Sequence, residues 1–235
     1  VADGKFVIGG FFSHVGGAPV AHLARVDATG ALDTTFTTGA GPSGSVRAIV
    51  RQGDGGLVIA GSFTAYNGVT TGANRIARLS ADGALDPAFA TAIGSGFNGQ
   101  VNALALAPDG RIGAAGTFTS LNGVSANRLA RLLPTGQPDT TFSTANGSAL
   151  NGAVLALVAH PDGRFSAGGS FSTFAGLPSS GLVRVLATGG VDSSFVVGSG
   201  LALGSSQTGT RSVNALALQP DGGLITGGFF GLYNG

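Results

Sequence analysis

The feature that most constrains this chain is internal repetition. One complete copy of the repeat runs from Val101 to Phe142, and two others occupy Val46–Phe89 and Val154–Phe195. Shortened copies stand at Val1–Phe36 and Val213–Gly235. Each copy carries an Asp-Gly turn, and successive turns lie 51 to 59 residues apart, beginning at Asp3, Asp54, Asp109, Asp162 and Asp221. Repetition at this period is typical of propellers and solenoids.

Each copy predicts four short strands and no helix. The first strand, as in Val101–Leu106, is apolar on both faces, which predicts a strand covered on both sides and the most buried of the blade. After the Asp-Gly turn, the second strand carries Gly before Phe, which marks a bulge or a close backbone approach. The third ends in Ala-Arg or Val-Arg, and the fourth carries Asp-x-x-Phe. Four short strands per repeat indicate a propeller blade, and no ten-residue segment keeps a helical period.

The repeat resembles a known family. Its motifs V-x-A-L-x-L-x-P-D-G, G-G-x-F, L-A-R-L and G-x-x-D-x-x-F recur in this order and resemble the bacterial delta-60 repeat, a β-propeller repeat of unknown function. The resemblance covers essentially the whole chain. It implies a propeller on a secreted or surface bacterial protein, and it brings no catalytic motif.

We therefore expect an all-β fold, a β-propeller of four-stranded antiparallel blades with about four to five blades, alone or within a larger ring. The expected domain is single, with repeats at 1–45 (partial), 46–100, 101–153, 154–212 and 213–235 (partial). A four-bladed ring would leave the strand at Gly223–Phe230 without a place. A larger ring, or exchange of this strand with a neighbouring molecule, would use it, and both remain open.

Composition narrows the classes of partner. Only 10% of residues are charged and the net charge is +1, which argues against nucleic acid and anionic membrane surfaces as partners. No apolar run is long enough to span a membrane. The lack of Cys excludes disulfides and thiol chemistry. Glu is absent and Lys5 is the only Lys, a bias that suggests an extracellular or cell-surface location. The start within a repeat and the lack of Met suggest an excised or processed piece.

The carboxylates predict no catalytic residue, no metal site and no cofactor. All eleven acids are Asp, and each belongs to a recurring turn or to the Asp-x-x-Phe motif, so none is left as a dedicated acid, base or metal ligand. Calcium at the blade turns stays open as an alternative. Two G-x-G-x-x-G stretches, Gly39–Gly44 and Gly94–Gly99, each lead into a strand rather than a helix, so we interpret them as linkers.

Two other recurring features indicate structure rather than function. An Arg precedes the Asp of each Asp-x-x-Phe motif by eight residues, which predicts structural Arg–Asp pairs on facing strands: Arg25 with Asp33, Arg78 with Asp86, Arg131 with Asp139, and Arg184 with Asp192. The Phe at the end of the second strand predicts core packing. The three His, at His14, His22 and His160, stand at different repeat positions, which predicts surface residues.

Function is expected where the copies differ from one another. Loops from second to third strand and from fourth to next first strand share one face of a propeller, so the unusual residues on that rim are candidates for ligand binding, together with the insert Gly198–Ser212. These candidates are Arg47, Asn102, Asn214, Arg211, His14 and Tyr66.

The sequence favours a non-enzymatic extracellular scaffold, acting as a protein-interaction or adhesion module. One alternative is a structural subunit of an extracellular filament assembled by strand sharing. Another is a glycan-binding propeller, although the lack of Trp counts against aromatic platforms for sugars. The expected partners are a protein or a cell-surface glycan, with self-association as a further option. Ligand and blade number stay open.

Overall fold

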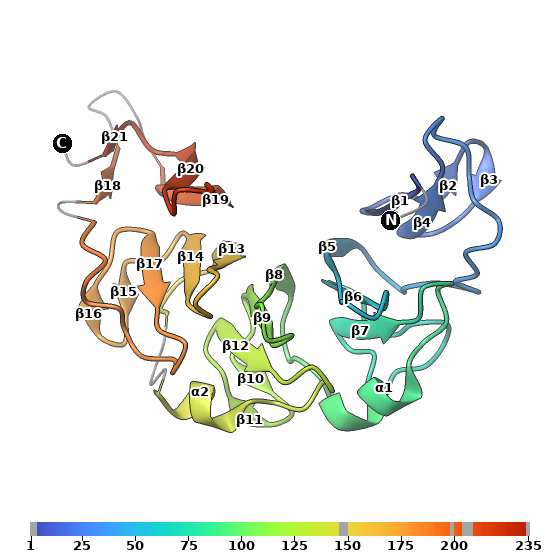
Figure 1. Ribbon diagram of the computed structural model, residues 1–235, viewed down its shortest axis with the longest axis horizontal. Helices are drawn as coiled ribbons and strands as arrows, with labels where there is room; N and C mark the ends of the chain where they lie inside the picture. Colours follow the sequence, from blue (N-terminus) through green and yellow to red (C-terminus); the bar gives the residue numbers. More distant parts are fainter. Residues whose placement is uncertain (1–3, 146–149, 198–199, 204–208, 234–235) are drawn as a thin grey trace.

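The protein forms an open arc of antiparallel β-sheets arranged as propeller blades (Figure 1). The computed structural model describes the chain except for residues 1–3, 146–149, 198–199, 204–208 and 234–235. The first and last blades lie at the two tips of the arc, which do not meet in Figure 1. The predicted all-β propeller fold is thus confirmed.

Three internal blades are three-stranded sheets, flanked by a two-stranded sheet at each end. The first blade consists of β1 (Phe6–Gly9) and β4 (Leu23–Val26), and the second of β5 (Val46–Arg51), β6 (Leu57–Gly61) and β7 (Ile76–Leu79). The third consists of β8 (Val101–Leu106), β9 (Ile112–Gly116) and β12 (Leu129–Leu132). The fourth consists of β13 (Val154–Ala159), β14 (Phe165–Gly169) and β17 (Leu182–Val185), and the fifth of β19 (Ser212–Leu218) and β20 (Leu224–Phe229).

Short strands of two residues lie at the ends of the blades that point away from the concave side of the arc (Figure 1). Three hairpins follow second strands, namely β2 (His14–Val15) with β3 (Ala18–Pro19), β10 (Ser120–Leu121) with β11 (Val124–Ser125), and β15 (Thr173–Phe174) with β16 (Leu177–Pro178). β21 (Leu232–Tyr233) of the last copy pairs with β18 (Leu201–Ala202) of the insert that precedes this copy. These hairpins replace what the sequence suggests is a plain loop.

The innermost strands β5, β8, β13 and β19 lie next to one another along the concave side of the arc (Figure 1). They are only partly buried, whereas every residue of the second strands β6, β9 and β14 is buried. The prediction that the first strand is the most buried is therefore wrong. One edge of the first strand faces the concave side of the arc. The second strand is enclosed by the other strands of its own sheet and by both neighbouring blades.

The hydrophobic core is divided into layers, one at each junction between blades. In β6, Leu57 and Ile59 belong to the layer shared with the first blade, while Val58 and Ala60 belong to the layer shared with the third. Successive residues of a strand point to opposite faces, so a strand buried on both faces must be apolar at every position. The continuous apolar pattern of the repeat follows from this arrangement.

The Gly before the strand-end Phe marks a close backbone approach in the four blades that have an inner strand, as predicted, but not at Gly10 of the first blade. A Cβ placed on Gly116 would lie 2.0 Å from the carbonyl oxygen of Gln100. The neighbouring strand is bulged at the same level, since the pairing register shifts between Val101 and Ala103. The same register shift recurs at the start of β5, β13 and β19.

The prediction of a full fourth strand and no helix is wrong in detail. The fourth strand is reduced to a single bridge, such as that between Leu79 and Leu85. Two helices follow, α1 (Pro87–Ile93) and α2 (Thr140–Ala145). Asp86 caps α1 by accepting hydrogen bonds from the backbone N–H groups of Ala88 and Phe89, and Pro87 suits the first turn. Seven and six residues are too few to show a helical period in the sequence.

Candidate functional site

The Arg–Asp pairs form the most regular polar feature of the molecule. Arg25 Nε donates to Asp33 at 2.6 Å, Arg131 Nε donates to Asp139 at 3.0 Å, and Arg184 Nε donates to Asp192 at 2.6 Å. Arg78 pairs with Asp86 as well. Arg78 also contacts Asp54 and Gln52. Each pair joins the third strand to the segment that follows it. The predicted structural pairing is confirmed.

The Asp carboxylates of these pairs also accept hydrogen bonds from the turn that follows them, and these bonds lower their pKa values. The hydroxyl of Ser194 and the guanidinium groups of Arg164 and Arg184 hold the pKa of Asp192 well below its usual range, although burial opposes the shift. Thr35 and Lys5 do the same for the pKa of Asp33. The guanidinium carbons of Arg25, Arg131 and Arg184 lie 4.5 to 5.0 Å from the ring centres of the following Phe residues.

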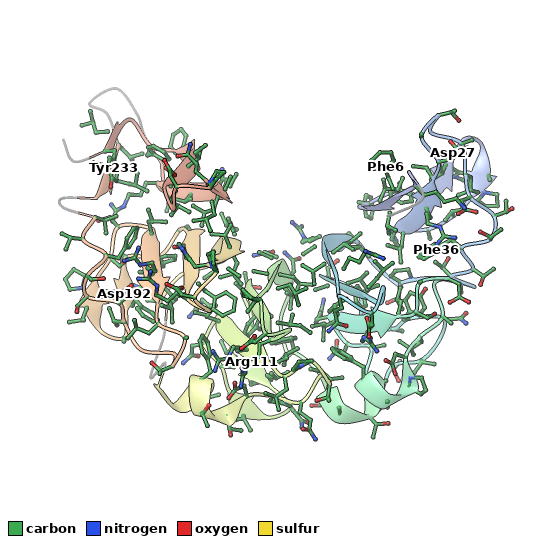
Figure 2. The ribbon with its side chains drawn as sticks, viewed as in Figure 1. Phe6, Asp27, Phe36, Arg111, Asp192 and Tyr233 are labelled. Atoms are coloured by element: carbon green, nitrogen blue, oxygen red, sulfur yellow. The ribbon has the colours of Figure 1, made fainter. Side chains whose placement is uncertain are left out.

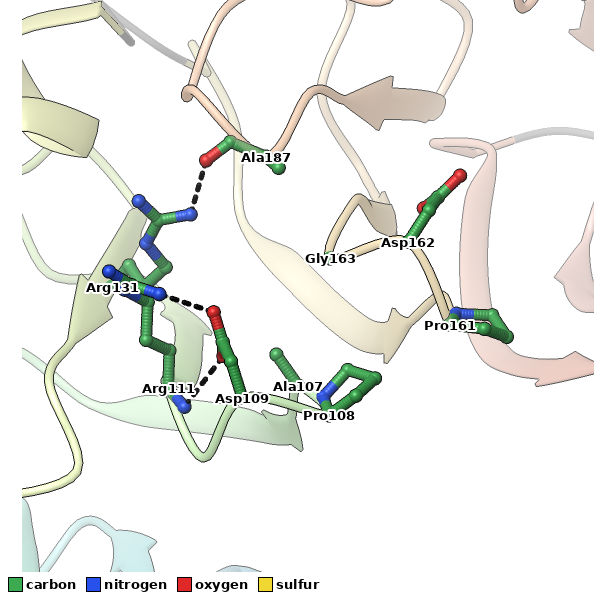
Figure 3. A pocket seen from close by; sticks show the side chains of 9 residues that line it. All are labelled: Ala107, Pro108, Asp109, Arg111, Arg131, Pro161, Asp162, Gly163 and Ala187. Atoms are coloured by element: carbon green, nitrogen blue, oxygen red, sulfur yellow. Dashed lines mark hydrogen bonds and ion pairs between the residues drawn. The ribbon is translucent and has the colours of Figure 1, made fainter.

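A cleft of about 370 Å³ opens between the third and fourth blades on the side of the Asp-Gly turns (Figure 3). Arg111 donates to Asp109 through its backbone N–H, at 3.0 Å, and through its guanidinium. Arg131 donates to the carbonyl of Ala187 in the next blade. Asp162 accepts from Arg164 Nε at 2.7 Å. Every charged side chain of this cleft thus has at least one partner within the protein, although the buried Nε of Arg111 makes no hydrogen bond among the described residues and lies 3.5 Å from Asp139.

A second cleft of about 340 Å³ occupies the equivalent place between the second and third blades. It is lined by Asp54, Arg78 and Asp86, which also pair with one another. Both clefts are lined by the recurring third-strand Arg, Arg78 or Arg131, which is paired with the Asp eight residues later, so these clefts belong to the scaffold. A charged ligand there would have to displace an internal partner.

Three of the predicted rim residues occupy one repeat position, the bulge at the start of the inner strand. These residues are Arg47, Asn102 and Asn214, and the fourth member of the series is Leu155. Arg47 and Asn214 are exposed. Asn102 is half-buried, where its amide donates to the carbonyl of Val154 in the next blade at 2.8 Å. The bulge therefore brings these side chains to the same level of the arc, on successive blades.

Tyr66 lies in the core and not on the rim, so the prediction that it binds a ligand is wrong. Its side chain is only 1% exposed, and its hydroxyl donates to the carbonyl of Gly83 at 2.6 Å. Burial raises the pKa of the Tyr66 hydroxyl. The ring occupies the core layer between the first and second blades, so it has no surface to offer a ligand.

The His residues divide between surface and interior. His14 is exposed on the outer hairpin of the first blade, 3.0 Å from the hydroxyl of Ser13. His160 is buried, contrary to the prediction of a surface residue, and its Nε2 lies 2.8 Å from the hydroxyl of Ser166. Burial lowers the pKa of His160. Among the described residues, no three His or Asp side chains gather in a way that could hold a metal ion.

Arg211 lines a separate pocket of about 300 Å³ between the fourth and fifth blades. Its Nε is buried and has no hydrogen-bond partner among the residues that the structure describes. Ser170 and Ser172 line the pocket from the end of the fourth blade's second strand, and Thr210 lines it from the insert. Of the insert, residues 198–199 and 204–208 lie outside the described residues. Arg211 is thus the one predicted rim residue that stands in a pocket with an unsatisfied donor.

The sequence singled out Arg211 but missed the Ser residues that face it. In the internal copies the same position is Gly, at Gly44, Gly99 and Gly152, because a Cβ there would press against the backbone at the strand-end Phe. The loss of this Gly in the copy with the long insert is the signal that marks the site. Ser170 and Ser172 follow an ordinary repeat position and carry no comparable signal.

The comparisons with known proteins bear first on the expected function. A solved structure of a gluconolactonase from Xanthomonas campestris resembles this chain at 14% sequence identity and a TM-score of 0.48. The match covers 88% of this chain and 62% of the gluconolactonase, so the chain spans less than two thirds of that protein's length. Similarity at this level concerns the fold and transfers no residue or activity. No curated protein matches the chain.

This finding corrects the prediction of a non-enzymatic scaffold. The gluconolactonase is an enzyme, and a fold by itself neither assigns nor denies an activity. The adhesive role and the filament and glycan-binding alternatives have no support in the structure and are set aside, while the extracellular or cell-surface location stays a prediction. Among the described residues, no helix is long and apolar enough to cross a membrane.

The comparison with protein families agrees with the repeat itself. The family model described as a domain of unknown function (DUF5122) beta-propeller matches residues 2–36, 52–89, 107–142 and 160–195. Each match begins beside an Asp-Gly turn and ends at the Phe of the Asp-x-x-Phe motif, and together they cover more than half of the chain. The chain therefore belongs to the DUF5122 beta-propeller family.

Proposed function

We propose that the chain binds a small oxyanion, the phosphate or carboxylate group of a ligand, in the pocket around Arg211. The observation that carries this proposal is the buried Nε of Arg211, which has no hydrogen-bond partner in the described part of the chain. A buried donor left unpaired costs about 1–3 kcal/mol, more when it is charged, and an anion in the pocket would satisfy it. The planar guanidinium is well suited to two oxygens of one such group.

The rest of the pocket suits an anion. Ser170 and Thr210 bring hydroxyl groups, and Gly209 brings a backbone segment without a side chain. The described lining residues include no carboxylate that would repel an anion or pair with the guanidinium. The ion-pair cleft of Figure 3 differs in this respect, because Asp109 and Asp162 both line it.

The test is a titration of the isotopically labelled protein with inorganic phosphate and, separately, with acetate at constant ionic strength. The Nε–Hε resonance of Arg211, assigned by its absence in Arg211→Gln, should shift and saturate. A Kd on the order of 1 mM would correspond to about 4 kcal/mol of binding free energy. Saturation by phosphate alone would assign a phosphate ligand, and saturation by acetate alone a carboxylate ligand.

Arg51→Gln is the matched control, because Arg51 is an exposed arginine on another blade and its loss removes the same charge. The control should bind as the unchanged protein does, while Arg211→Gln should lose saturable binding. A shift that stays linear with both anions, or equal binding by the two variants, would contradict the proposal.

We also propose that the repeat is the bacterial delta-60 repeat. The support is the order of its motifs, which places V-x-A-L-x-L in the inner strands, G-G-x-F at the end of the second strands, and L-A-R-L in the third strands.

A further inference from the structure

The last blade exposes a face that the internal blades cover. Ile225 of β20 is 55% exposed. Val58, which occupies the position of Ile225 in the second blade, is fully buried against the third blade. Ala215 and Ala217 of β19 are exposed in the same way. We call Ala215, Ala217 and Ile225 the C-terminal flank.

An unused hydrogen-bond donor borders this flank. In the third blade, Asn102 donates to the carbonyl of Val154 on the inner strand of the fourth blade, at 2.8 Å. Asn214 occupies the same position in the fifth blade, where it is exposed and has no such acceptor among the described residues. A following inner strand would offer the missing carbonyl.

We propose that the C-terminal flank docks a further blade of this same repeat. The partner is defined by its chemistry: an inner strand with a free backbone carbonyl at the position of Val154, and a second strand with apolar side chains at the positions of Leu57 and Ile59. These are the groups that each internal blade presents to the blade before it.

A second copy of this chain does not meet that requirement. Its first tip, where Phe6 is 59% exposed, begins with β1, which is a second strand (Figure 2). The described part of the first blade has no inner strand, so it offers neither the carbonyl for Asn214 nor a cover for Ala215 and Ala217. The flank therefore fits a complete blade.

The experiment compares two extended chains with the chain itself. Asn122-Gly123 and Asn234-Gly235 occupy the same repeat position, so a copy of residues 124–142 appended after Gly235 completes the fifth blade. A copy of residues 124–195 completes it and adds a sixth blade. Ile225→Asp is introduced into both, with Val69→Asp as the control, because Val69 is an exposed apolar residue away from the flank at 43% exposure.

Docking predicts that amide hydrogen exchange in β19 and β20 slows on the order of tenfold more with the longer extension than with the shorter. Ile225→Asp should abolish this difference, and Val69→Asp should leave it unchanged. Equal exchange in the two extended chains would overturn the proposal. So would a concentration-dependent dimer of the unextended chain that Ile225→Asp dissociates, because the flank would then serve a second copy.

Discussion

Adding one methyl group at Gly116 should destabilise the protein, although Gly→Ala usually does the opposite. Gly116 lies in the buried second strand of the third blade, at the bulge of the neighbouring strand. A Cβ there would meet the carbonyl oxygen of Gln100 at 2.0 Å and the Cα of Val101 at 2.9 Å. Both contacts are with backbone, so relief requires a shift of the strand rather than a side-chain rotation.

Two opposing effects set the magnitude. Loss of backbone freedom in the unfolded chain stabilises a compatible Gly→Ala by about 0.4–1 kcal/mol. Extra volume in a packed core destabilises by about 1–3 kcal/mol, and this site should lie at the upper end because the neighbour is a carbonyl oxygen. We expect Gly116→Ala to lower the free energy of unfolding by about 2 kcal/mol, which corresponds to a fall in Tm of about 4–8 °C for a chain of this size.

Gly53→Ala is the matched control. Nothing lies within 4 Å of a Cβ at Gly53, and its φ lies outside the left-handed region. This variant should be neutral or slightly more stable than the unchanged protein. Urea unfolding at equal slope gives the difference directly. Equal midpoints for Gly116→Ala and Gly53→Ala would refute the close approach and the bulge with it.

Three further predictions test the interior and the ion pairs. Tyr66→Phe should lower the free energy of unfolding by about 1–2 kcal/mol, because it leaves a buried carbonyl without its donor, and should leave anion binding unchanged in the same titration. Arg131→Met should cost about 3–5 kcal/mol in urea unfolding, because its side chain is 9% exposed and its carboxylate partner stays buried. Arg111→Met, at 40% exposure, should cost about 1 kcal/mol or less, so equal losses would contradict this ranking. The pKa values of Asp33 and Asp192 are lower in the folded protein than the unfolded value of about 3.9, so their stabilisation is present above that pH and lost as pH falls towards the folded values. Urea midpoints that stay constant from pH 5 to about 2 would contradict this linkage.

The repeat made the blades predictable, because it places the same residue types in the same environments. The apolar inner and second strands, the Gly at the close approach and the Arg–Asp spacing of eight residues each report a local contact within one blade or with its neighbour. The two short helices were not predictable from periodicity. Their signal is the cap at Asp86 followed by Pro87, which was interpreted as part of a fourth strand.

The candidate site was predictable only in part. Subtracting the repeat singled out Arg211, whose position is Gly in the internal copies. The same subtraction misplaced Tyr66, because a rare residue in a loop can still fold back into the core between blades. The prediction that His160 is a surface residue was wrong as well, because its burial depends on packing around Ser166 in the fourth blade. Sequence differences identify unusual positions, and only the packing decides which of them reach the surface.

Hydrogen exchange of the unextended chain, followed strand by strand, tests the open arc most directly. The second strands β6, β9 and β14 are enclosed by blades on both sides, whereas β20 has an uncovered face. We predict that the amides of β6, β9 and β14 exchange only through global unfolding and that those of β20 exchange through a smaller local opening. Protection of β20 equal to that of β9 would contradict the account, because the fifth blade would then be covered as the internal blades are.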